Sequence, residues 1–341
     1  MMPPRPVTFL VAILLPIAVG CGDASQSPSS SSQLGGAQFT TVGRIHTTFV
    51  DSSRPTQANG SYPGAPTRTL TSIVWYPGVA TDGAGGDEIP CLAGIASGHR
   101  GGDGRCVVRE DAALDDSGAP YPLIVFSHGF GNGAVATTSY AQALASYGYV
   151  VVAPDFPLSK SDAPGGSTVS DLPAQTGDVS FLIDVFLGQV ADTAAPFPGR
   201  IDAQRIGAAG RSLGGSTTLL VTHNVKYKDA RIRASAPVSP GWVLQTAFYG
   251  TDGYFAGIDT PLLIIGGSAD TTAPYPTNDQ PPYDLASPPK ILVELLGEGH
   301  TPETPGANAA LIAFFDAYLS GHTGELAVID ALAGAVIQKQ L

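Results

Sequence analysis

A serine stands in a glycine-walled turn near the middle of the chain. Residues 210–214, Gly-Arg-Ser-Leu-Gly, have the G-x-S-x-G pattern and lie between the short apolar segment RIGAAG and an apolar, helix-like segment. A strand-to-helix turn of this kind forces strained backbone angles on the serine and lets its hydroxyl point out above a sheet. The pattern therefore indicates that Ser212 is a nucleophile, although the same pentapeptide also occurs in ordinary loops.

A serine hydroxyl is a weak nucleophile at neutral pH, so it needs a base, and the base needs a group that orients it. In an α/β sheet with such a turn, the acid and then the histidine follow the serine, each after a strand. Asp270 follows the apolar segment PLLIIGG, and His300 follows KILVELL. The remaining histidines precede the serine, lie on the helix after it or follow the final helix: His46, His99, His128, His223 and His322.

The acid has four rivals downstream of the serine, namely Asp252, Asp259, Asp279 and Asp284. Asp259 precedes its strand, while Asp279 and Asp284 lie in a proline-rich segment further from a strand end. Each such residue alone is more often a surface charge. Because three residues of the required types stand in the required order, the sequence predicts Ser212 as nucleophile, His300 as base and Asp270 as the orienting acid.

A second glycine motif, GFGNGA at 129–134, has two interpretations. It satisfies the G-x-G-x-x-A form of a dinucleotide-binding turn, with Asp155 about 20 residues further on. More than a hundred residues precede it, however, and the first residues of the chain are typical of an export signal. An exported protein meets little nicotinamide cofactor. The favoured interpretation is an oxyanion loop in which the N–H groups of Phe130 and Leu213 stabilise negative charge, each worth about 3 kcal/mol. The Phe130 ring is expected to line the acyl pocket, and no cofactor is expected.

These residues require strands that end at one edge of a sheet. Short apolar segments alternate with helix-like ones, which predicts an α/β fold with a mostly parallel central sheet and helices on both faces. The expected strands are 37–50, 67–77, 121–127, 149–154, 205–210, 231–238, 261–267 and 290–296. The expected helices are 137–147, 178–190, the segment after Ser212, and 307–319, with a loop-rich insertion at 78–119.

The composition suits a globular α/β protein. The chain has 341 residues, of which 43% are hydrophobic and 13% charged, enough for one large domain or two small ones. We expect a single domain over 37–341. With a formal net charge of −12, the chain has no basic stripe to neutralise phosphates, so we expect neither nucleic acid nor an anionic membrane surface as partner. We expect a monomer.

The first residues are typical of an export signal. Arg5 precedes an apolar segment from Val7 to Val19, which is too short to span a bilayer. Small residues directly before Cys21 resemble a bacterial lipoprotein signal, which implies a lipid on that cysteine and a protein of the cell envelope; an ordinary signal peptide cut near Gly20 is the alternative. Residues 22–36 are a Ser/Gly-rich linker.

An exported protein meets oxidising conditions, so Cys91 and Cys106 are predicted to form a disulfide. A metal site is the weaker alternative, because two cysteines without nearby histidines fall short of four-coordinate zinc.

The motifs PLIVFSHGFGN, LASYGYVVVAPD, RIGAAGRSLGG, SADTTAP and GEGHT resemble the α/β-hydrolase superfamily over residues 67–319. The resemblance is to the branch of dienelactone-hydrolase-like proteins, platelet-activating-factor acetylhydrolases, chlorophyllases and bacterial polyester hydrolases. It implies the same roles for Ser212, Asp270 and His300, and backbone donors at Phe130 and Leu213. Arg211 departs from the histidine usual before the serine.

The resemblance also implies that Trp242, after the strand that follows the serine turn, is an aromatic substrate platform; a packed core tryptophan is the alternative. The expected function is a serine carboxylester hydrolase acting on a small or polymeric ester. A thioesterase, acyltransferase or peptidase with the same triad is the alternative, and a non-catalytic surface-binding lipoprotein is a further one.

Overall fold

The continuous apolar segments of the chain form the middle of a twisted sheet. The computed structural model describes residues 39–80, 86–90 and 105–341. Six strands lie in the order β10–β9–β8–β7–β5–β6, and every neighbouring pair among them is parallel. Their bounds are β5 Tyr121–Ser127, β6 Val150–Pro154, β7 Ile201–Arg211, β8 Ile232–Val238, β9 Leu262–Gly267 and β10 Lys290–Leu295. Buried on both faces, they need no polar alternation.

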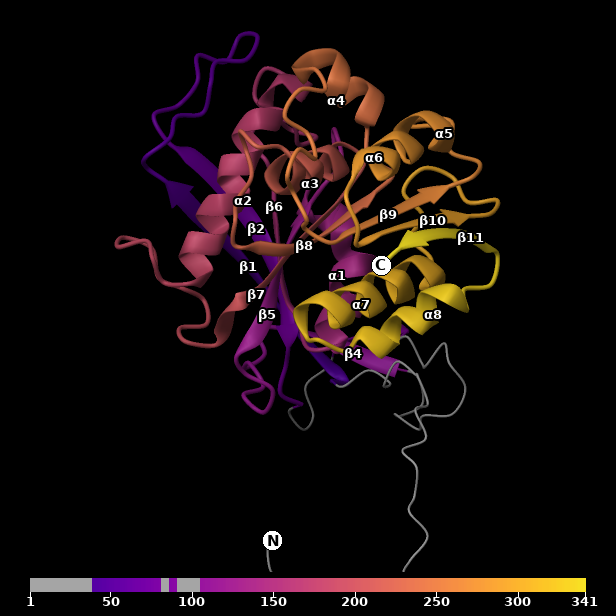
Figure 1. The fold of residues 1–341 in the computed structure, drawn as a ribbon. Coiled ribbons are helices and arrows are strands. Elements are labelled where there is room, and N and C mark those ends of the chain that lie inside the picture. Colours follow the sequence, from indigo (N-terminus) through magenta and orange to yellow (C-terminus); the bar gives the residue numbers. More distant parts are fainter. Residues whose placement is uncertain (1–38, 81–85, 91–104) are drawn as a thin grey trace, which may run out of the picture. The chain divides into compact units, whose positions relative to one another are not determined.

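Antiparallel strands extend this parallel sheet on both sides. On one side β2 (Arg68–Pro77) pairs with β6, and β1 (Thr41–Asp51) pairs with β2. On the other side β11 (Ala335–Gln340) pairs with β10. The described part of the chain thus forms a sheet of 11 strands (Figure 1).

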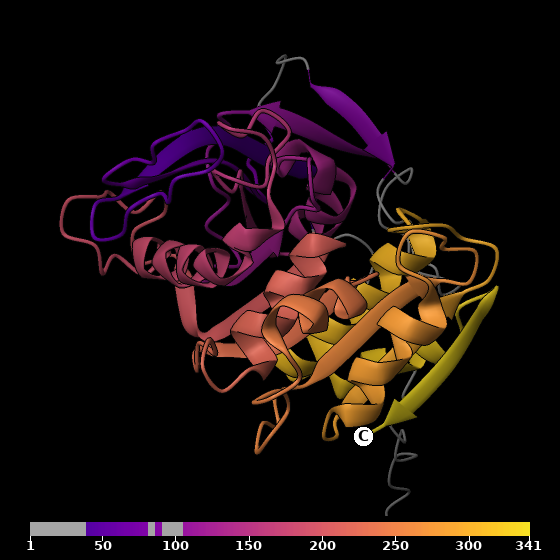
Figure 2. The same ribbon diagram turned by 90° about the horizontal axis from the view of Figure 1, so that it is seen from above.

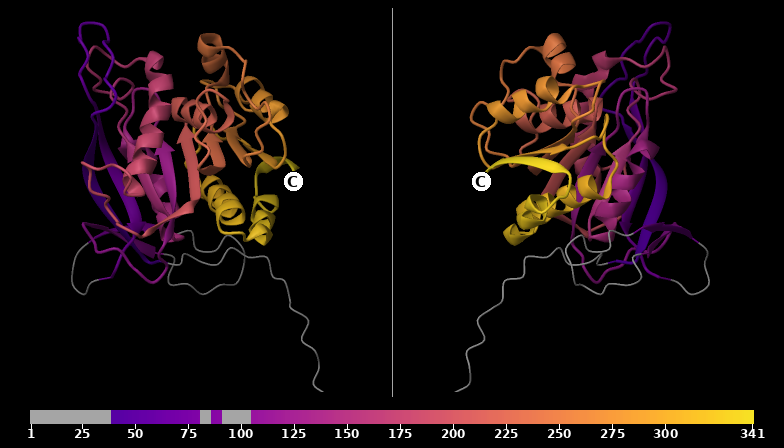
Figure 3. Two further views of the ribbon diagram at one scale, coloured as in Figure 1. Left: turned by 60° about the vertical axis from the view of Figure 1, so that its left-hand side comes forward. Right: turned by 90° about the vertical axis from the view of Figure 1, so that its right-hand side faces the viewer.

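Helices cover the sheet on both faces. In β5, Ile124 and Phe126 belong to one apolar cluster and Leu123 and Val125 to another, because successive strand residues point to opposite faces. The first cluster includes α1 (Thr138–Ser146), α7 (Pro305–Leu319) and α8 (Leu326–Asp330); the second includes α2 (Leu172–Phe186), which packs on α3 (Leu213–His223). The two helical layers are seen from further directions in Figures 2 and 3.

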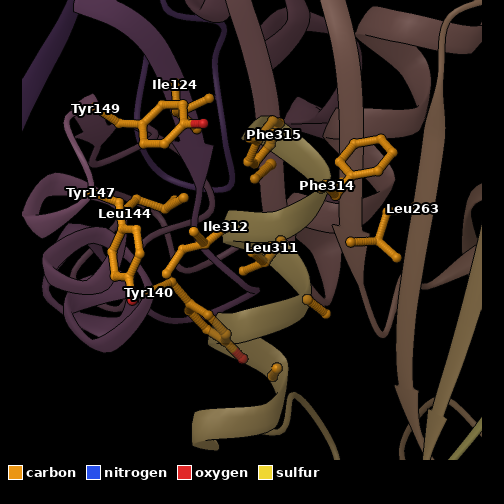
Figure 4. Packing of buried hydrophobic residues seen from close by; sticks show 14 of the residues in the cluster. Ile124, Tyr140, Leu144, Tyr147, Tyr149, Leu263, Leu311, Ile312, Phe314 and Phe315 are labelled. Atoms are coloured by element: carbon orange, nitrogen blue, oxygen red, sulfur yellow. The ribbon is translucent and has the colours of Figure 1, made fainter. Parts of the chain in front are cut away.

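Aromatic and aliphatic side chains fill the space between α1, α7 and the sheet. Figure 4 shows Tyr140 and Leu144 of α1 on the side of Leu311 and Ile312 of α7, all of them buried. Further along α7, the Phe315 ring lies toward Tyr149. Rings this large remove much apolar area from water, so this cluster fixes α7 against the strands. The loop before α7, which carries His300, therefore ends at a firmly held helix.

Short helices follow the carboxyl ends of two strands. These are α4 (Trp242–Tyr249) after β8, and α5 (Tyr275–Asn278) and α6 (Gln280–Leu285) after β9. Among the helices of the described residues, none has the length and apolarity that a bilayer crossing requires.

Two elements differ in detail from the expectation. The loop-rich segment 78–119 also contains two short strands, β3 (Asp87–Pro90) and β4 (Arg105–Glu110), and β4 pairs in parallel with β1. Their shortness and interspersed charges hid them. Helix α2 also begins at Leu172 rather than at 178, with Pro173 in its first turn, where the fixed proline φ suits a helix start.

Candidate active site

Ser212 occupies a strained turn between β7 and α3. Its φ of 54° and ψ of −120° are unusual for a residue with a side chain, and the turn is held by a hydrogen bond from Ser212 N to the Val238 carbonyl oxygen (2.9 Å). Strain of this kind persists only where the surrounding structure imposes it, and it occurs most often at functional sites. The turn lifts Ser212 Oγ above the N-terminus of α3.

The glycines around the serine allow three segments to approach each other. A methyl group at Gly214 would overlap the carbonyl oxygens of Ser127 and His128, which end β5 and begin the following loop. A methyl group at Gly210 would overlap the carbonyl of Gly214. Only glycine therefore fits at these two positions, and this brings the loop after β5 against the serine turn.

The structure brings the three residues predicted from chain order into one hydrogen-bonded series. His300 Nε2 lies 2.8 Å from Ser212 Oγ, and His300 Nδ1 lies 2.6 Å from Asp270 Oδ2. The Asp270 side chain is fully buried, and its other oxygen accepts the backbone N–H groups of Thr272 (2.8 Å) and Ala273 (2.9 Å). The carboxylate is thus fixed so that one oxygen faces the imidazole.

The four rival acids lie elsewhere. Asp252, Asp259 and Asp284 are exposed, whereas Asp279 is fully buried at the start of α6. Burial raises the pKa of Asp279 well above its usual value, with the Asp270 charge adding to the effect. Neither of its oxygens has a hydrogen-bond partner among the described residues. The surroundings of Asp279 therefore favour its neutral form.

Backbone donors face the serine from two segments. Gly129 lies so close that a methyl group on it would be 3.3 Å from Ser212 Cβ, which places the next residue, Phe130, beside the serine. Within the described part of the chain, the N–H groups of Phe130 and Leu213 donate to no other group. The Phe130 side chain is 46% exposed, as expected for a residue that lines an open site. Free N–H groups at a helix N-terminus suit a developing oxyanion.

The loop that carries Phe130 is held by hydrogen bonds that the order of motifs in the sequence did not predict. The N–H of Gly131 donates to the Ser159 carbonyl (2.8 Å), and the Asp155 carboxylate accepts the N–H of Ala134 (2.6 Å). The ring of His128 donates to the Gly129 carbonyl and accepts the N–H of Phe156. Burial lowers the pKa of His128, so a neutral imidazole that connects the two segments is favoured. In the resemblance to a dinucleotide turn, Asp155 would face a ribose; here it fixes the loop.

Trp242 is not the surface platform that was expected. It is 5% exposed, and its ring packs edge-on against Tyr254, with the centroids 5.1 Å apart, and against Phe255 at 6.0 Å. The indole is the largest side chain of this apolar cluster, so burying it between α4 and the next segment stabilises both. The alternative, a packed core tryptophan, is correct.

The cysteine predictions fall partly outside the described residues. Cys106 lies buried on β4 and is disulfide-bonded, whereas Cys21 and Cys91 are outside the described residues, so the pairing with Cys91 and the lipid on Cys21 remain predictions. In the ranges that the structure covers, no group of three or more His, Cys, Asp or Glu side chains is arranged to hold a metal ion.

The sheet, the turn and the helical layers are those of an α/β-hydrolase fold. A solved structure of a ferulic acid esterase from Streptomyces cinnamoneus superposes on this chain with a TM-score of 0.58 at 22% identity, covering 84% of this chain and 93% of that one. At this level of identity the similarity concerns the fold.

Sequence comparison identifies the family. Residues 96–321 match the PETase family, described as PET hydrolase-like, and the chain belongs to this family. Cutinase est1 of Thermobifida alba is 26% identical over 182 residues, which are 53% of this chain and 53% of that protein. Bis(hydroxyethyl) terephthalate hydrolase of Streptomyces coelicolor is 28% identical over 172 residues, 49% of this chain and 46% of that protein. The chain thus spans about half the length of these relatives.

Proposed function

We propose that the protein is a serine carboxylester hydrolase that works through an acyl-enzyme on Ser212. The observation that carries the proposal is the series Ser212 Oγ, His300 and Asp270, with separations of 2.8 and 2.6 Å, next to two free backbone N–H groups. Membership of a family of polyester hydrolases and similarity to proteins named cutinases support it.

Acylation follows from this arrangement. His300 Nε2 takes the proton of Ser212 Oγ as the oxygen bonds to the ester carbonyl carbon, and Asp270 stabilises the resulting imidazolium through Nδ1. The carbonyl oxygen becomes an oxyanion, and the N–H groups of Phe130 and Leu213 stabilise it. When the tetrahedral intermediate collapses, the bond to the alcohol oxygen breaks, and His300 gives that oxygen the proton.

Deacylation repeats the same steps with water. His300 Nε2 takes a proton from a water molecule as its oxygen attacks the acyl carbon, and a second oxyanion forms in the same hole. Collapse breaks the bond to Ser212 Oγ, which regains its proton from His300 and leaves the carboxylic acid. Both half-reactions use one base, so each triad residue acts twice in a turnover.

The substrate class is an ester of a carboxylic acid, small or polymeric. The matched relatives are named for cutin and for bis(hydroxyethyl) terephthalate, which supports an ester with a bulky or repeating partner. The exposed Phe130 ring at the edge of the site is proposed as a wall of the acyl pocket.

Hydrolysis of p-nitrophenyl butyrate by the wild-type protein and by Ser212→Ala tests the proposal. We expect turnover in the wild type and a loss of at least about a thousandfold in the variant, because removing any triad member leaves only binding and the oxyanion hole. Equal rates in the two proteins would refute it. A panel from acetate to long acyl chains, with a polyester film, then defines the substrate. Weak ester turnover with full labelling of Ser212 by a fluorophosphonate would instead favour a thioesterase, acyltransferase or peptidase.

We also propose that the protein is exported and anchored through a lipid on Cys21. The support is the sequence of the first 21 residues, with its single Arg5, its apolar segment and the small residues before the cysteine. Palmitate labelling of wild-type protein in a bacterial host, absent in Cys21→Ala, is the expected result. Equal labelling of the two proteins, or none, would contradict the anchor.

A further inference from the structure

Arg211, directly before the candidate nucleophile, connects three segments of the site. Its Nη2 donates to Thr301 Oγ1 (2.5 Å), and its Nη1 donates to the Ala136 carbonyl (2.9 Å) and forms an ion pair with Glu303 Oε1 (3.0 Å). Thr301 directly follows His300, and Ala136 lies in the short helix after the oxyanion loop. One guanidinium thus joins the serine turn, the base loop and the end of the oxyanion loop.

The base loop needs such a support, because its backbone is strained next to the base. Thr301 has a φ of 54°, in the left-handed region that a β-branched residue rarely adopts. Its N–H donates to Ser239 Oγ (3.3 Å), a long hydrogen bond, and the following Pro302 carbonyl accepts Tyr140 Oη (2.8 Å). The Arg211 guanidinium adds a third contact, because it donates to the side-chain hydroxyl of Thr301.

The charge of Arg211 is balanced within the same loop. The Arg211 side chain is 16% exposed and Glu303, two residues beyond Thr301, is 40% exposed, so the pair is only partly screened by water. Glu303 thus offsets the positive charge of Arg211 within the loop that carries His300. The Nε of Arg211 is buried and has no hydrogen-bond partner among the residues described. A buried donor without a partner lowers the stability of the fold. The guanidinium is therefore oriented toward Thr301, Ala136 and Glu303 at a cost in stability.

We propose that Arg211 is a positioning residue that fixes the His300 loop against the Ser212 turn through Thr301 and Glu303. The proposal rests on the proposed hydrolase function and adds to it the residue that sets the distance between nucleophile and base. It acts in the chemical step and not in substrate affinity, because its guanidinium is directed to groups of the protein. Lysine cannot replace it fully, since a single ammonium does not present a planar fork to acceptors on separate segments.

The test compares kcat and KM on p-nitrophenyl butyrate across matched variants. Arg211→Met is expected to lower kcat about 10- to 100-fold with KM nearly unchanged, since a misplacement of about 1 Å has effects of this size. Arg211→Lys should recover part of the loss. Thr301→Val, which removes the acceptor oxygen, should lower kcat in the same direction, and Thr301→Ser, which keeps it, should stay near wild type. The double variant Arg211→Met/Thr301→Val should be no slower than Arg211→Met alone, because both remove one interaction.

Arg231→Met is the control. Arg231 also forms two ion pairs, with Asp184 and Asp229, but it lies at the amino end of β8, away from the serine. It should lower the thermal midpoint without changing kcat, so a purely structural effect of Arg211 would look the same in both variants.

Each outcome bears on a different claim. A wild-type kcat in both Arg211→Met and Thr301→Val, with an active wild type, overturns this inference alone. A rise in KM at constant kcat also overturns it, because Arg211 would then contact the substrate. Neither ester turnover nor fluorophosphonate labelling in the wild type overturns the proposed function and this inference with it. If Arg211→Met does not fold, the Thr301→Val and Thr301→Ser pair still decides between the outcomes.

Discussion

The substitution Asp270→Asn should trap the candidate base in the wrong tautomer. One carboxylate oxygen of Asp270 accepts the N–H groups of Thr272 (2.8 Å) and Ala273 (2.9 Å), and the other lies 2.6 Å from His300 Nδ1. An asparagine keeps its oxygen toward the two N–H donors, because turning the amide around would remove two hydrogen bonds of about 1 kcal/mol each and leave buried donors unpaired. The amide NH₂ therefore faces His300 Nδ1.

An imidazole that accepts a hydrogen bond at Nδ1 carries its proton on Nε2. That nitrogen lies 2.8 Å from Ser212 Oγ and can then no longer accept the serine proton. The same tautomer effect in a serine protease lowers kcat by about ten thousandfold, which is about 5 kcal/mol of activation free energy. We expect a loss of this order here, with little change in the fold because the two side chains have nearly the same shape.

The assay measures kcat on p-nitrophenyl butyrate for wild type and Asp270→Asn, with the thermal midpoint followed by circular dichroism as the control for folding. A folded variant that keeps more than about a tenth of the wild-type kcat would contradict this role of Asp270. It would mean that another carboxylate orients His300.

Three further predictions concern groups outside the triad. Asp279→Asn should keep the wild-type kcat, and a large loss of kcat would contradict this. Burial favours the neutral Asp279 carboxyl in the fold, whereas the unfolded chain ionises, so wild-type stability falls as pH rises above the ordinary aspartate pKa. The variant should therefore have the higher thermal midpoint at pH 8 and the same midpoint as wild type at pH 4. Burial lowers the pKa of His223 from 6.5 to about 4, so the unfolded state binds a proton that the folded state does not as pH falls from 6.5 to 4. About 3 kcal/mol of stability should be lost over this pH range. Urea unfolding at both pH values should show a smaller loss in His223→Gln, and equal losses in the two proteins would refute the prediction. Arg68→Met should destabilise the protein by about 3–5 kcal/mol in urea unfolding at unchanged kcat, because it leaves the buried carboxylate of Asp171 without its cation and that of Asp178 with Arg54 alone. A cost below about 1 kcal/mol would contradict the assigned pairing.

The parallel core and the candidate triad follow from local rules. Segments such as 121–127 are apolar throughout, which only a strand buried on both faces tolerates, and the structure has β5 at these residues. The positions of Asp270 and His300 directly after such segments predict that they meet at the same sheet edge, where the structure places them. Because the carboxyl ends of neighbouring parallel strands lie together, the order of motifs was enough.

Contacts between distant segments could not be predicted in this way. Trp242 shows no periodicity that would tell a platform from a core residue, and its burial depends on Tyr254 and Phe255, which come from a segment without a motif. Arg211 stands where the related proteins usually have histidine, and this difference marked the position as unusual. It did not indicate which groups Arg211 contacts. Those partners, Ala136, Thr301 and Glu303, are set by tertiary packing.

The same holds for the short strands of the insertion. β4 pairs with β1, and Val107 lies opposite Thr41, which is more than sixty residues earlier in the chain. β4 itself has only six residues, with charges at both ends, so its own sequence gives little indication of a strand. Pairing with an existing edge overrides weak local preference.

The central claim is that Ser212 Oγ is the nucleophile of an acyl transfer. The most direct measurement is intact and peptide mass spectrometry after treatment with a fluorophosphonate, run on wild type, Ser212→Ala and Asp270→Asn. We predict one adduct per wild-type chain, mapped to Ser212, none in Ser212→Ala, and strongly slowed labelling in Asp270→Asn. Labelling at another residue, or a folded wild type that is not labelled, would contradict it.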